Sequence, residues 1–262
     1  MDTKIVTTIA CLFFLLTNCD FSPQGQKQQD AVPPCVFAQQ GSRTYPQSSE
    51  TKGEKQSDGS YTYGSHNYLV RGDFGTKKIT NRDFNEVVFT NIPTGYEEFE
   101  DVYTRYLGKH INGTAAMMVM AMEIYGRDKA VGEKCLRLIN TRNNIPSVMN
   151  ILKDRYGNYA ADGYSQRYIA AALIDGAVRA NGYAPNEPYT IKFQGSPNGI
   201  RQITMPKYGF VYYIYAIGGG WDTHQRQCEI VLFEGDDLYK INNCPSFYTQ
   251  CQPIKGEWEG LK

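Results

Sequence analysis

The second half of the chain most constrains the fold, because it holds five strand-like segments in close succession. Short turns rich in glycine, proline and aspartate separate these segments, a pattern typical of hairpins. The strands are expected at residues 189–193, 200–205, 210–217, 226–233 and 237–241. Strands joined by short turns pair antiparallel with their neighbours. The sequence therefore predicts an antiparallel meander over about residues 188–255, and it leaves open whether the sheet curls into a barrel.

The segment before the meander, about residues 94–180, favours helices. One of its helices is apolar on nearly all faces, which is typical of a helix at the centre of a core. The helices are expected at about residues 95–107, 115–128, 128–139 and 145–156, after short strands at 67–71, 77–80 and 86–92. A helical half followed by a meander predicts one α+β domain, over residues 61–262.

The N-terminus has the pattern of a bacterial lipoprotein signal over residues 1–19. Lys4 precedes an apolar run of about 12 residues, too short to span a bilayer and suited to a signal peptide. Cys19 follows that run, which predicts lipidation at Cys19 after cleavage; a plain signal peptide cut nearby is the alternative. Residues 20–60 are polar and low in complexity, so they are expected to form a disordered tether. Either way we expect an exported protein, and in the first case one anchored to a bacterial membrane on its periplasmic or cell-surface face.

Composition argues against several classes of function. The chain has 27 basic and 27 acidic residues, and this balance argues against a nucleic-acid binder with a broadly basic surface. The sequence lacks a nucleophile elbow, a phosphate loop, a dinucleotide-binding glycine motif and the paired histidines of a zinc protease. We therefore expect no cofactor and no metal.

The densest group of reactive side chains lies in one predicted hairpin. Trp221, Asp222, His224 and Arg226 follow a glycine-rich turn, and together they form a candidate interaction surface. Cys228 shares a strand face with His224, but four residues of strand span about 13 Å at roughly 3.3 Å per residue. A direct Cys–His pair needs contact, so catalysis by these two residues is not expected.

Four cysteines remain in the predicted domain, and they could pair in three ways. Cys244 and Cys251 are the pair nearest in sequence. A disulfide needs Cα atoms within about 7 Å, so this pairing requires a turn at Pro245 and Ser246.

Several short motifs resemble an uncharacterised bacterial family, a domain of unknown function common in exported proteins and lipoproteins. The resemblance covers about residues 83–255 and rests on the order of the motifs. They are Asn91-Ile92-Pro93, Gly113-Thr114-Ala115-Ala116, Gly176-Ala177, Asn181-Gly182-Tyr183, Pro188-Tyr189 and Pro245-Ser246-Phe247-Tyr248. The family also has a turn similar to Gly220-Trp221-Asp222-Thr223, but here His224-Gln225 replace its Pro-Arg step. The resemblance implies no activity.

These observations favour a lipid-anchored envelope protein that acts as a non-enzymatic binding or structural module. Its partners would be the membrane and another envelope protein or a small ligand, with residues 207–241 as one docking surface. The alternative is an exported hydrolase with a site near the Gly218–Cys228 hairpin. The 20 tyrosines bear on this choice, because tyrosines exposed on one sheet face would indicate ligand binding.

Overall fold

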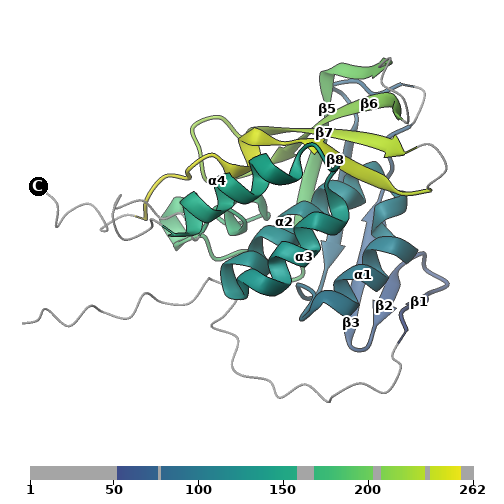
Figure 1. Ribbon diagram of the computed structural model, residues 1–262, viewed down its shortest axis with the longest axis horizontal. Helices are drawn as coiled ribbons and strands as arrows, with labels where there is room; N and C mark the ends of the chain where they lie inside the picture. Colours follow the sequence, from purple (N-terminus) through teal and green to yellow (C-terminus); the bar gives the residue numbers. More distant parts are fainter. Residues whose placement is uncertain (1–51, 76–77, 158–167, 203–207, 234–236, 255–262) are drawn as a thin grey trace, which may run out of the picture. The chain divides into compact units, whose positions relative to one another are not determined.

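The computed structural model describes residues 52–75, 78–157, 168–202, 208–233 and 237–254. The predicted signal peptide, the predicted lipidation site Cys19 and most of the predicted tether lie outside these residues. Eight strands form one antiparallel sheet in the order β1 to β8, and the α-helices of the described residues are all inserted between β4 and β5 (Figure 1). The class is α+β, as predicted.

The sheet joins strands from both ends of the described chain. Antiparallel β4 and β5 pair from Phe84–Gln194 to Phe89–Tyr189, which places the first four strands directly beside the C-terminal meander. The strands are β1 (Glu54–Lys55), β2 (Tyr61–Tyr63), β3 (His66–Arg71), β4 (Phe84–Phe89), β5 (Tyr189–Gln202), β6 (Tyr208–Ile217), β7 (Gln225–Phe233) and β8 (Tyr239–Asn243).

Four α-helices cover one face of the sheet. They are α1 (Tyr96–Arg105), α2 (Ile111–Arg127), α3 (Lys129–Ile139) and α4 (Ile145–Gly157). Helix α2 contacts β4, β6, β7 and β8, and its side chains are buried from Ile111 to Tyr125. Its all-round apolar character therefore has the predicted cause, a position at the centre of the core. The methionines of α2 are fully buried core residues.

The structure corrects two predictions about the sheet and answers one question that the sequence left open. Four strands precede the helices, so the chain is not simply a helical half followed by a β half. The sheet is open, with β1 and β8 at its edges, and does not close into a barrel. Residues 78–80 form no strand. In addition, the sheet begins at Glu54, within the predicted tether. A two-residue strand is too short for an alternating pattern, so no local signal marks it.

The start of helix α1 is stabilised by a residue inside the helix rather than by its N-cap. Gly95 is at the N-cap, and no side chain caps the helix. Instead, the buried carboxylate of Glu98 accepts hydrogen bonds from the backbone N–H of Thr94 at 2.8 Å and from its hydroxyl at 3.1 Å. Helix α2 begins at Ile111, four residues before the predicted start at residue 115. The other helix starts agree with the sequence.

Glu98 also fastens β3 to the helical layer. Its Oε1 accepts a hydrogen bond from the hydroxyl of Tyr68 at 2.7 Å and contacts Nδ1 of His66 at 2.6 Å. All three side chains are buried. One turn later, Asp101 accepts hydrogen bonds from the backbone N–H of Gly53 and from the hydroxyl of Tyr61. Two acidic residues of α1 therefore hold the first three strands in place.

Candidate functional site

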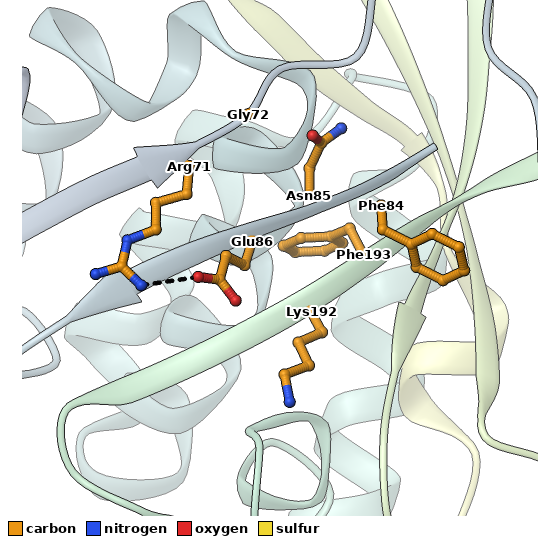
Figure 2. A pocket seen from close by; sticks show the side chains of 7 residues that line it. All are labelled: Arg71, Gly72, Phe84, Asn85, Glu86, Lys192 and Phe193. Atoms are coloured by element: carbon orange, nitrogen blue, oxygen red, sulfur yellow. Dashed lines mark hydrogen bonds and ion pairs between the residues drawn. The ribbon is translucent and has the colours of Figure 1, made fainter. Parts of the chain in front are cut away.

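A hollow of about 460 Å³ lies where β3 ends beside β4 and β5. Cross-strand pairing builds it, because Arg71 lies opposite Glu86, and Glu86 lies opposite Lys192. Figure 2 shows these three side chains following one another across the three strands. The lining residues are Arg71, Gly72, Phe84, Asn85, Glu86, Lys192 and Phe193.

The end of β3 opens the hollow. Gly72 follows the last residue of β3 with a φ of +74°, a left-handed conformation that glycine adopts readily. A Cβ atom at this position would lie 2.1 Å from Oδ1 of Asn85. The carbonyl of Gly72 accepts a hydrogen bond from the side-chain amide of Asn112 at 3.2 Å, near the start of α2. The chain therefore turns away from β4 here, and α2 holds the turn.

The charged side chains of the hollow form exposed ion pairs. Arg71 contacts Glu86 at 2.9 Å, and Lys192 contacts Asp175 at 2.9 Å. The side chains of Arg71 and Lys192 are 58% and 49% exposed. Pairs this exposed contribute about 0–1 kcal/mol, so either cation can exchange its partner for a ligand at low cost.

Phe84 gives the hollow an apolar rim. It is 67% exposed, the highest value among the large hydrophobic side chains in the described ranges. Its ring points away from β4 beside the row of charges (Figure 2). A single exposed apolar residue is ordinary. Here, however, it borders two cations and a concave surface, which is the combination of an apolar wall and polar groups that ligand sites use.

The predicted interaction surface in the hairpin contacts the C-terminal segment. Trp221 is buried and donates its indole N–H to the carbonyl of Gln250 at 2.8 Å. Asp222 accepts a hydrogen bond from Gln252. The guanidinium of Arg226 lies 4.4 Å from the centre of the Trp221 ring, and partial burial lowers its pKa. These contacts brace the turn.

His224 is exposed, and its Nδ1 donates a hydrogen bond to the carbonyl of Gly218 at 2.9 Å. Cys228, in contrast, is fully buried on β7, and this burial raises the pKa of its thiol. The structure therefore does not bring His224 and Cys228 together as a catalytic pair. Burial also raises the pKa of the Cys135 thiol, to about 12, which disfavours the reactive thiolate.

His110 has an acidic partner in the fold. Its Nδ1 lies 3.2 Å from Oδ2 of Asp73, in the segment after β3. The two residues are distant in sequence, so no local pattern could have revealed this contact.

The tyrosines mostly serve the core. Every tyrosine whose side chain the structure describes is buried or half-buried. This distribution does not provide an exposed aromatic sheet face, so the hollow beside Phe84 is the better candidate for ligand contact.

Two further features concern metals and membranes. The described residues hold no group of three or more histidine, cysteine, aspartate or glutamate side chains that could bind a metal ion. None of the helices in the described ranges has the length and hydrophobicity that a membrane span requires.

The order of motifs along the domain is matched by a known family. Residues 91–255 match the family model described as Domain of unknown function (DUF6935). The chain belongs to this family. The predicted resemblance to an uncharacterised domain family is thereby confirmed, over a slightly shorter range. No curated protein and no solved structure matches the chain. The DUF6935 match starts after β4, so the hollow combines residues inside and outside the matched region.

Proposed function

We propose that this DUF6935 protein is a non-enzymatic binding module of the bacterial envelope, with the hollow of β3, β4 and β5 as its ligand surface. The observation that carries the proposal is the lining of the hollow. Two exposed cations, Arg71 and Lys192, flank one carboxylate beside the exposed ring of Phe84. This arrangement suits a small anionic ligand that also has an apolar part.

The contacts of the hairpin support a structural role there. Its tryptophan, aspartate and arginine hold the turn and the C-terminal segment together, and its histidine binds a backbone carbonyl. A hydrolase needs a base that is oriented toward a nucleophile. The rival function therefore gains no support from the positions of His224 and Cys228.

Anchoring of the module rests on the signal pattern that ends at Cys19. A lipid on Cys19 would place the domain at a membrane surface, on a tether that continues to the first strand. Mass spectrometry of the mature N-terminus tests this. The expected terminus is a diacylated or triacylated Cys19, and an unmodified terminus at another residue would refute lipidation.

Ligand binding is tested with a defined probe, N-acetylphenylalanine, which combines a phenyl ring and a carboxylate. Its amide, which lacks the charge, is the matched control ligand. Calorimetric titration of the full chain should show weaker binding of the amide. Loss of one exposed charge contact of about 1 kcal/mol weakens binding roughly five-fold.

Variants locate the binding. Lys192→Gln and Phe84→Ser should each weaken binding of the acid several-fold. Lys153→Gln removes an exposed lysine on α4, away from the hollow, and should leave the affinity unchanged. Equal binding of acid and amide, or equal affinity of the Lys192→Gln variant and the unmodified chain, would contradict the proposed surface.

A further inference from the structure

Cys228 and Cys244 are neighbours across β7 and β8. The pairing of Glu229 with Asn243 sets the register, and in an antiparallel pair the next step places Cys228 opposite Cys244, just past the end of β8. Both cysteines are fully buried, and both are free thiols in the structure. The Cys228 thiol lies within hydrogen-bonding reach of the Cys244 thiol. The Cys244 sulfur also lies 2.8 Å from the hydroxyl of Tyr248.

This geometry suits a covalent link. Opposite residues of antiparallel strands have Cα atoms about 4.5–5.5 Å apart, and disulfides span about 4.4–6.8 Å between Cα atoms. From the sequence three pairings are open, and Cys244 with Cys251 is the pair nearest in sequence. The required turn exists, as the 3-10 helix Pro245–Tyr248. However, Cys251 packs against Gly220, where an added Cβ would lie 3.0 Å from the Cys251 Cβ.

We propose that Cys228 and Cys244 form a disulfide that links β7 to β8 in the exported protein. The proposal rests on the export proposed above, because disulfides persist in oxidising compartments. Two S–H bonds break and one S–S bond forms. The two electrons and two protons pass to a disulfide-bearing oxidant, such as an oxidised thiol oxidoreductase or oxidised glutathione, which is reduced to two thiols.

The link forms during folding, before the two sulfurs become buried. The thiolate is the attacking species in thiol–disulfide exchange, and burial raises the pKa of the Cys228 thiol in the folded chain. Folded, reduced protein is therefore expected to oxidise much more slowly than protein that refolds in the presence of the oxidant.

Peptide mapping tests the pairing directly. The full chain is reduced, unfolded, refolded with oxidised and reduced glutathione, alkylated and digested with trypsin. Cys228 lies in the tryptic peptide of residues 227–240, whereas Cys244 and Cys251 share the peptide of residues 241–255. A second digestion with chymotrypsin after Phe247 or Tyr248 separates these two cysteines. The expected product is a linked pair of peptides that carry Cys228 and Cys244.

The other products would overturn the proposal. A peptide of residues 241–255 that is unlinked and lighter by two hydrogens would indicate a Cys244–Cys251 bond. Full alkylation of Cys228 and Cys244 after oxidative refolding would show that no bond forms between them. As controls, Cys251→Ala should keep the link and Cys244→Ala should lose it.

Stability and cellular location give two further readouts. The link closes a loop of about 15 residues, so oxidation should raise the Tm by roughly 5–10 °C. This increase should be absent in Cys228→Ala. The same mapping on protein alkylated in intact cells tests export separately. Free thiols in cells together with a link after refolding would overturn the export but support the pairing, whereas no link after refolding would refute the pairing itself.

Discussion

Glu123 on α2 provides a sharp test of how the core is built. Its side chain is 1% exposed, and Oε1 lies 3.2 Å from Nε of Arg127. Oε2 is buried and has no hydrogen-bond partner within the described part of the chain. Burial raises the pKa of this carboxyl from 4.5 to about 7, although Arg127 opposes the change. Replacing Glu123 with Gln mimics the protonated carboxyl at every pH.

The sign of the effect follows from proton binding. The folded state binds the proton of the Glu123 carboxyl more tightly than the unfolded chain does. Below about pH 4.5 this carboxyl therefore does not reduce the free energy of unfolding. Stability then falls as the pH rises through the folded-state pKa of about 7, and above that pH it no longer changes. A change in pKa from 4.5 to about 7 corresponds to about 3 kcal/mol.

Urea unfolding of the full chain between pH 4.5 and pH 8.5 measures this effect. We expect Glu123→Gln to be more stable than the unmodified chain by up to about 3 kcal/mol at the highest pH, with the difference shrinking toward the lowest pH. Glu133→Gln is the matched control, because Glu133 and Arg137 form the same i,i+4 pair on an exposed face of α3. A difference between Glu123→Gln and the unmodified chain that does not change with pH would refute the reasoning.

Three further substitutions test other contacts. Glu98→Ala removes the buried carboxylate that holds β3 to α1 and should cost about 3–5 kcal/mol in urea unfolding, whereas the exposed neighbour Glu97→Ala should change stability by less than about 0.5 kcal/mol. Asp128→Ala removes the acceptor of two backbone N–H groups at the start of α3, so it should cost about 1 kcal/mol and speed amide exchange in the first turn of α3. Gly72→Ala places an alanine at a positive φ and in a clash with Asn85. It should therefore both lower the Tm and weaken the binding of N-acetylphenylalanine. An unchanged Tm together with unchanged binding would contradict the structure of the turn.

Local signals explain the predictions that the structure confirms. Asp128 at the N-cap of α3 marked a helix start, because its carboxylate satisfies free backbone N–H groups. Cys228 and Ile230 are both buried on β7, as the alternation of that strand predicts. The all-round apolar pattern of α2 placed this helix in the core. Each of these features depends on residues close together in sequence.

The missed features depend on residues that are far apart. Arg71 and Glu86 lie before the helices and Lys192 lies after them, so only the pairing of β4 with β5 brings the hollow together. The His110–Asp73 contact has the same origin. At the hairpin, by contrast, the reactive residues are close in sequence, and their contacts brace a turn. Proximity in sequence is a poor guide to a site that the sheet assembles.

The most direct test of the proposed binding surface is a chemical-shift map of the ¹⁵N-labelled full chain during titration with N-acetylphenylalanine. We expect saturable shift changes at Arg71, Gly72, Phe84–Glu86 and Lys192, with little change at residues 218–226. Saturable changes confined to residues 218–226, or no saturable change at the hollow, would contradict it.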